Sequence, residues 1–224
     1  MHIPDGLVDP ATAVVTTAVG AGLVAYALKK SKEALDDRRI PIVGLMAAFV
    51  FAAQMVTFPI AGGTSAHLLG GAMAGILLGP WLGGLAMTVV YLVQAIGFAD
   101  GGITALGANV IAVGFLPAVG GYYLFRGLTR ILPGTRMSYL GSVAVVSLAT
   151  TVAASALVAV FISFGGPLPL IAFPIMVGIH SIVGFGEALI SMSVIAAVLG
   201  ARPDLIFDQD RLPERASAPG GEVA

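Results

Sequence analysis

The stretch Tyr139–Phe164, YLGSVAVVSLATTVAASALVAVFISF, decides the fold of this chain. It contains no charged residue, and it exceeds the roughly 20 residues that a helix needs to cross about 30 Å of hydrocarbon. Because a backbone exposed to lipid must satisfy its hydrogen bonds within its own segment, the stretch predicts a transmembrane helix.

Six further apolar runs are bounded by charge, glycine or proline. They are Ala11–Leu28, Pro41–Ile60, Ala66–Gly79, Trp81–Phe98, Ile103–Phe125 and Leu170–Leu199. The composition agrees, since the chain is 58% hydrophobic and 10% charged, against about 45–50% and 25% in soluble domains. We predict an all-α polytopic membrane protein with seven transmembrane helices, formed by residues 1–200, and a polar cytoplasmic tail of residues 201–224.

The basic residues predict the orientation of these helices. Every Lys and Arg follows the first, fifth or seventh run: Lys29, Lys30, Lys32, Arg38 and Arg39, then Arg126, Arg130 and Arg136, then Arg202, Arg211 and Arg215. Because connections alternate sides across seven spans, these clusters share one face, which the positive-inside rule makes cytoplasmic. We expect the N-terminus outside and the C-terminus inside.

Composition also excludes several partners and sites. The chain has no Cys, so it has neither disulfides nor thiolate metal sites. The formal net charge of -1 gives no reason to expect nucleic acid as a partner. A phosphate-binding loop and protease-type spacings are absent, so we expect a non-catalytic protein that does not hydrolyse ATP itself.

The third apolar run is too short to span the membrane comfortably. Ala66–Gly79 reaches only about 21 Å as a helix at 1.5 Å per residue, and the preceding stretch from Phe58 to Ser65 is rich in Gly and Pro. Irregular backbone at membrane depth is tolerated only in protein or beside a cavity. We therefore expect a recessed outer pocket whose wall carries His67.

The first residues, Met1–Gly6 (MHIPDG), have the pattern of a metal ligand rather than of a targeting signal. They lack the basic region and cleavage site of a signal peptide, so we expect the Met1 terminus to be retained. The amine of Met1, the amide nitrogen of His2 and the imidazole of His2 can close fused chelate rings around one ion. A deprotonated amide favours an ion with tetragonal geometry, such as Ni(II), Cu(II) or low-spin Co(II).

His67 is the expected fourth ligand, because it lies on the same outer side and one imidazole completes a four-nitrogen set. The alternative is a histidine that only bonds loop carbonyls. Supporting residues are expected among Asp100, Thr104 and Asn109, with Gln94, where the alternative is helix capping or interhelical hydrogen bonding.

Two ionisable residues in the last run are functional candidates by position. His180 either lines the pocket behind the ligands or is simply hydrogen-bonded. Glu187 either satisfies other buried polar groups or docks a partner subunit. Their separation of about 10.5 Å along the helix prevents them from sharing one small ion.

Small residues recur every four positions in two runs and let helix backbones approach closely. They are Ala13, Thr17, Ala21 and Ala25 in the first run and Gly44, Ala48 and Ala52 in the second. Internal packing and docking to another membrane subunit both explain them.

Four stretches together resemble the CbiM/NikM family. They are MHIPDG at Met1–Gly6, PIAGGTSAH at Pro59–His67, LGPW at Leu78–Trp81 and GGITALGAN at Gly101–Asn109. The family comprises the substrate-binding S components of energy-coupling factor transporters for cobalt and nickel. The resemblance covers the membrane portion to about residue 200.

The resemblance implies a seven-helix subunit in a bacterial or archaeal cell membrane that binds Ni(II) or Co(II) as its transported substrate through Met1, His2 and His67. It implies a transmembrane coupling subunit, two ATPase subunits and a small accessory membrane subunit as partners, and no organic cofactor. A compact four-nitrogen set with an amide favours nickel slightly over cobalt. Two alternatives stay open, namely a secondary transporter with its own ion coupling and a structural membrane subunit that binds no metal.

Overall fold

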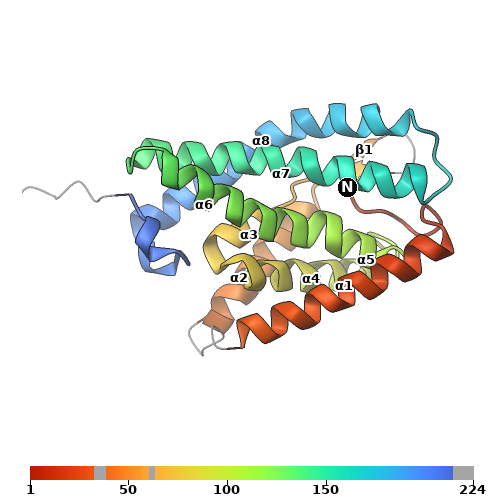
Figure 1. Ribbon diagram of the computed structural model, residues 1–224, viewed down its shortest axis with the longest axis horizontal. Helices are drawn as coiled ribbons and strands as arrows, with labels where there is room; N and C mark the ends of the chain where they lie inside the picture. Colours follow the sequence, from red (N-terminus) through yellow and green to blue (C-terminus); the bar gives the residue numbers. More distant parts are fainter. Residues whose placement is uncertain (33–38, 61–63, 214–224) are drawn as a thin grey trace, which may run out of the picture.

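The computed structural model describes residues 1–32, 39–60 and 64–213. Its main helices are α1 (Pro10–Ser31), α2 (Arg39–Gln54), α3 (Gly71–Leu78), α4 (Pro80–Gly97), α7 (Arg136–Phe164) and α8 (Ala172–Ala201). Between α4 and α7, one continuous helical segment comprises α5 (Leu106–Asn109), the π-helical η1 (Val110–Gly120) and α6 (Gly121–Ile131). The helices lie roughly along one long axis as a bundle (Figure 1).

Each of the seven apolar runs contains a helix, so the helical class of the protein is confirmed. Five segments are long and apolar enough to cross a membrane: Pro10–Ser31, Pro80–Gly97, Leu106–Ile131, Arg136–Phe164 and Ala172–Ala201. The helices α2 and α3 are shorter, with 16 and 8 residues. Local signals begin two of the long helices, since Asp9 caps α1 and Thr135 caps α7 through their side-chain oxygens.

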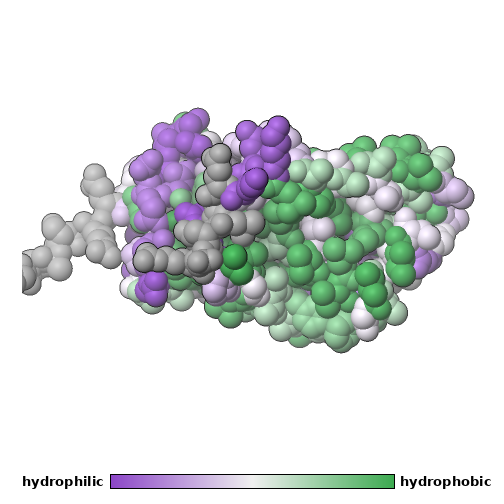
Figure 2. All heavy atoms as spheres, turned by 90° about the horizontal axis from the view of Figure 1, so that it is seen from below, coloured by the Kyte–Doolittle hydropathy of each residue, from purple (hydrophilic) through white to green (hydrophobic). Residues whose placement is uncertain are grey.

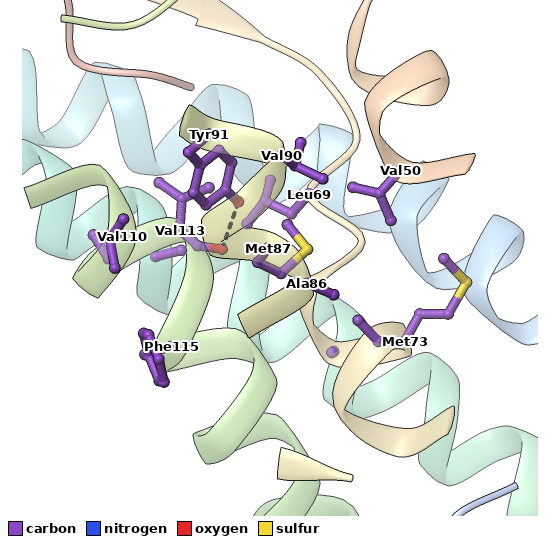
Figure 3. Packing of buried hydrophobic residues seen from close by; sticks show 14 of the residues in the cluster. Val50, Leu69, Met73, Ala86, Met87, Val90, Tyr91, Val110, Val113 and Phe115 are labelled. Carbon is purple, nitrogen blue, oxygen red and sulfur yellow. Dashed lines mark hydrogen bonds between the residues drawn. The ribbon is translucent and has the colours of Figure 1, made fainter. Parts of the chain in front are cut away.

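The short helix α3 lies at the centre of the bundle, and all its residues are buried. Its small side chains allow close contact with two neighbours. A Cβ atom at Gly75 would collide with the carbonyl oxygen of Ala118 in η1, and one at Gly83 in α4 would lie 2.7 Å from the amide nitrogen of Gly75. Figure 3 shows this core, in which the Tyr91 hydroxyl donates to the Val113 carbonyl over 2.9 Å.

The chain between α2 and α3 differs from the sequence prediction. The second helix ends at Gln54 rather than Ile60, and two short strands follow, β1 (Phe58–Ile60) and β2 (Thr64–Ala66), paired antiparallel. This hairpin is the exception to the all-α prediction. A hairpin satisfies backbone groups that the Gly/Pro-rich sequence cannot place in a helix; residues 61–63 lie outside the described part.

The fifth run also differs in extent, because its helix begins at Leu106 rather than Ile103 and continues to Ile131. The described start of the tail folds back onto the bundle in two single turns, η2 (Pro203–Leu205) and η3 (Gln209–Arg211). Ile206 is 2% exposed, and the Asp208 carboxylate accepts a hydrogen bond from the Tyr122 hydroxyl over 3.2 Å. The division of the chain at residue 200 stays a prediction.

The most strongly hydrophilic side chains gather at one end of the molecule, apolar ones dominate the middle, and a few weaker hydrophilic patches lie at the other end (Figure 2). The strongly hydrophilic end contains the end of α1, the start of α2, the α6–α7 turn and the end of α8 (Figure 1). The described Lys and Arg residues therefore lie together, as predicted; Arg38 and Arg215 lie outside the described residues.

We predict that Gly75→Val disrupts the packing of α3 against η1, because the added carbons have no space beside Ala118. Overpacking of this kind costs about 1–3 kcal/mol or more, so the thermal unfolding midpoint in detergent should fall. Gly141→Ala is the control, because nothing lies within 4 Å of a Cβ at that position. Equal midpoints for the two variants would contradict the close approach.

Candidate metal centre

The first residues of the chain run back into the bundle. Met1 and Ile3 are 0% exposed and His2 is 4% exposed. Figure 1 places the N-terminus within the bundle, near β1 and away from the outer surface. The N-terminal amine is therefore part of the protein interior.

Hydrogen bonds to the residues between α4 and η1 hold this N-terminal segment in place. The Asn109 side chain accepts from the Ile3 amide over 2.8 Å and donates to the Ile3 carbonyl over 3.0 Å. The Gly102 amide donates to the same carbonyl over 2.8 Å. One turn further on, an Asp5 carboxylate oxygen accepts from the Thr104 amide at 2.8 Å and from its hydroxyl at 2.5 Å.

Two adjacent glycines make this approach possible. A Cβ at Gly101 would lie 3.2 Å from the His2 Cβ, and one at Gly102 would collide with the backbone of Asp5. Gly101 also has a φ of +95°, a conformation that side chains with a Cβ rarely adopt. The Gly-Gly pair is therefore a requirement of the docked N-terminus.

The structure brings His2 and His67 together, with ring centroids 4.4 Å apart. The edge of Tyr91 packs against His2, with ring centroids 5.2 Å apart. His67 is 1% exposed and lies beneath the surface. The sequence instead predicts a position on the wall of a recessed outer pocket. The ring of His2 in the N-terminal segment packs against the His67 ring.

Each imidazole is oriented through its Nδ1 atom. The His67 Nδ1 donates to the Leu68 carbonyl over 2.7 Å, and the His2 Nδ1 lies 3.1 Å from an Asp100 carboxylate oxygen. The Nε2 atoms of both rings are buried and have no hydrogen-bond partner among the described residues. Buried polar atoms normally have partners, so unpartnered nitrogens on two imidazoles in contact point to a ligand.

Burial favours the neutral form of these nitrogen groups. It lowers the pKa of the Met1 amino group well below its ordinary value of 8.0, an effect that the Asp100 carboxylate partly offsets. The pKa of His67 is lowered well below 6.5, first by burial and then by the nearby N-terminal charge. The pKa of His2 is also lowered, because the effect of burial exceeds the opposing effect of the contact with Asp100. Neutral nitrogens with lone pairs are the form that binds a metal ion.

Sequence reasoning missed one buried residue of this centre, Gln54. Its amide donates to the Leu69 carbonyl over 2.7 Å and accepts from the Gln94 amide over 2.9 Å, and both glutamines are 0% exposed. It also lies beside the His2 ring, where it contributes to raising the pKa of that imidazole. A single glutamine at the end of an apolar run gives no spacing signal.

The two candidates in α8 have different surroundings. Glu187 is 2% exposed, and its carboxylate oxygens accept from the amides of Leu69 and Gly70, each over 2.8 Å. Of its two expected roles, this favours satisfying buried groups over direct docking. His180 is 0% exposed and donates from Nδ1 to the Met176 carbonyl over 2.8 Å, while its Nε2 has no partner among the described residues.

The four small residues expected to dock a partner, Ala21, Gly44, Ala48 and Ala52, are all exposed, so they do not pack inside the chain. In α1, the close internal contact is made instead by Gly20, whose Cβ position lies 3.4 Å from Gly107.

The candidate metal-binding atoms of this centre come partly from the main chain. Among the described residues, no three His, Cys, Asp or Glu side chains converge to hold a metal. The available donors are two imidazoles and the main-chain nitrogens of Met1 and His2. Such a set suits late divalent transition metals rather than magnesium or calcium, which prefer oxygen.

Fold and site together define a polytopic helical membrane protein with a buried nitrogen-rich centre at its N-terminus. Residues 2–205 match the family model for CbiM, described as the cobalt uptake substrate-specific transmembrane region. The chain belongs to this family.

Relatives agree over nearly the whole chain. A protein of Haloquadratum walsbyi is 41% identical over 93% of this chain and 94% of its own length. The fused nickel transport protein NikMN of Rhodobacter capsulatus is 36% identical over 97% of this chain and 66% of its own length. A crystal structure of a transition metal transporter superposes with a TM-score of 0.81 at 30% identity, covering 89% of this chain and 93% of the other.

We predict that Asn109→Leu weakens metal binding by about 10–100-fold, the range seen when a residue supporting a metal ligand is lost. The variant removes both hydrogen bonds to Ile3 and so frees the strand that carries Met1 and His2. Isothermal titration with Ni(II) measures the effect. Thr104→Val should cost less, because the Asp5 carboxylate keeps its bond to the Thr104 amide; a larger loss with Thr104→Val would contradict this order.

Proposed function

We propose that this chain is the substrate-capture subunit of an ATP-driven nickel or cobalt uptake transporter, and that Met1, His2 and His67 bind the ion. One observation carries the proposal: the N-terminal amine is buried beside two imidazoles whose rings are 4.4 Å apart. Relatives named as nickel and cobalt transport proteins support the class of substrate.

The chelate proceeds from the N-terminus. The Met1 amine and the His2 amide nitrogen form one ring with the ion, the His2 Nδ1 closes the second, and His67 supplies the fourth nitrogen. Because the His2 Nδ1 faces Asp100 at 3.1 Å, the ion takes the place of this contact. Four nitrogens in a plane suit a square-planar d8 ion, so we favour Ni(II) over Co(II) as cargo.

The site is proposed to open to the outside of the cell membrane. The centre lies at the end of α4 that is remote from the basic residues, since α4 runs from Pro80 near Lys30 and Arg126 to Gly97 near Asp100. With the basic end cytoplasmic, the metal centre is in the outer half. All seven helical segments then traverse or enter the membrane, with α3 enclosed by the others.

Transport requires partners in this proposal. A transmembrane coupling subunit, two ATPase subunits and a small accessory membrane subunit would complete the transporter, since this chain contains no phosphate-binding loop. The exposed small residues Gly44, Ala48 and Ala52 of α2 and Ala21 of α1 offer faces for close helix contact.

A secondary transporter is the main alternative. It would use acids or histidines near the membrane midplane for ion coupling. Glu187 is already committed to two backbone amides, which speaks against such a role. The other alternative, a structural subunit that binds no metal, leaves unexplained the buried Nε2 of His67, which has no partner among the described residues.

Adding one residue before Met1 should abolish high-affinity metal binding, because it converts the amine into an amide while every side chain survives. A formyl group retained on the Met1 amine should have the same effect. Ni(II) titration of the purified chain, with its terminus verified by mass spectrometry, tests this. Unchanged affinity in the extended chain would exclude the N-terminal chelate.

Ala48→Leu should lower assembly with partner subunits and metal accumulation in cells, since a larger side chain prevents close approach on α2. Metal binding by the purified variant should equal that of the unchanged protein, because Ala48 is exposed and remote from the donors. ATP-independent nickel or cobalt uptake by vesicles containing this chain alone would instead favour the secondary transporter.

A further inference from the structure

Gln54 lies between the two halves of the metal centre, and no part of the proposed chelate assigns it a role. We propose that Gln54 is a positioning residue that holds the His67 loop against the docked N-terminus, so that retention of the metal ion depends on the position of α2. This inference rests on the proposed metal site.

The peptide of Leu69 is held from two sides. Its amide donates to Glu187 in α8 over 2.8 Å, and its carbonyl accepts from Gln54 in α2 over 2.7 Å. His67 precedes it by two residues, and the His67 ring is oriented by the Leu68 carbonyl. The direction of the His67 imidazole therefore depends on the backbone that Gln54 and Glu187 fix.

The side-chain oxygen of Gln54 connects it to the N-terminal half of the centre. Its side-chain carbonyl accepts from the Gln94 amide over 2.9 Å. The backbone carbonyl of Gln94 accepts from the Asp100 amide over 3.1 Å, and the Asp100 carboxylate lies 3.1 Å from the His2 Nδ1. A chain of polar contacts thus connects the loop after His67 with Asp100 beside the ring of His2; in the proposed chelate the ion replaces only the last contact, between Asp100 and His2 Nδ1.

The helix that carries Gln54 is lightly held. Its buried residues are Met46, Val50 and Gln54, spaced four apart on one face. Val50 supports the same loop, since a Cβ at Gly70 would lie 2.7 Å from a Val50 methyl carbon. Figure 3 shows Val50 of α2 beside the loop that carries Leu69.

The opposite face of α2 is exposed and carries Gly44, Ala48 and Ala52. A force applied to that face would displace Val50 and Gln54 together and pull on Leu69. Because packed elements move as units, a small shift of α2 would turn the His67 nitrogen away from the ion. The helix therefore connects its exposed face with a metal ligand.

The test compares Ni(II) dissociation from the purified chain into excess chelator. Gln54→Met keeps the side chain's length but cannot donate to the Leu69 carbonyl, and it should speed dissociation about tenfold, the size expected for one buried hydrogen bond. Gln94→Met removes only the bond between the glutamines and should have a smaller effect. Dissociation from Gln54→Met at the unchanged rate would overturn the proposal.

Met46→Ala is the matched control, because it loosens the same face of α2 without touching the loop. It should lower thermal stability yet leave dissociation within about twofold. In Cu(II)-loaded samples, Gln54→Met should shift the EPR hyperfine splitting, since His67 leaves the ligand plane, whereas Met46→Ala should not. Equal effects of the two variants on dissociation and EPR would mean that Gln54 acts only through packing.

A measurement on the unchanged protein covers the case in which Gln54→Met fails to fold. Ni(II) should slow hydrogen exchange at residues 68–70 and in the last turn of α2 together; protection limited to residues 1–3 would overturn the inference. His67→Ala separates the two proposals. If His67→Ala still binds Ni(II) tightly, the proposed metal site is wrong. If His67→Ala loses binding but Gln54→Met releases Ni(II) at the unchanged rate, the metal site stands and only the role of Gln54 and α2 is wrong.

Discussion

The rest of this structure depends on the insertion of the N-terminal strand into the helical bundle. His2 meets His67 only because the chain end reaches the protein interior, and the two hydrogen bonds between Asn109 and Ile3 hold it there. The Gly101–Gly102 turn gives this segment the space that it needs, and His67 is buried where the His2 ring meets it. In lipid, these polar contacts have no competing water, so each must be made within the protein.

Much of the fold was predictable because the bilayer imposes strong rules on sequence. Apolar runs located every main helix, and the charges located the basic end. The pairing of Met1 and His2 with His67 was also predictable in outline, since chelate chemistry depends on residue order near the chain end. The structure places the rings of His2 and His67 in contact; their role as ligands stays a proposal.

Other features could not be predicted, for physical reasons. The pairing of β1 with β2 depends on backbone hydrogen bonds that hydropathy does not encode. Gln54 looks like a tolerated polar residue at a helix end, and its importance comes from partners 15 and 40 positions away in sequence. The buried position of His67 was missed, because the strand covering it is remote in sequence. Glu187 was identified as a candidate, but its backbone partners could be found only from the tertiary structure.

The long sequence separation between Ile3 and Asn109, 106 residues, has a consequence for biogenesis. Residues 1–5 are synthesised before their partners, which follow only after α1 to α4 have been made. The segment therefore docks onto a bundle whose first four helices already exist, and the buried centre around His2 and His67 is completed late in folding.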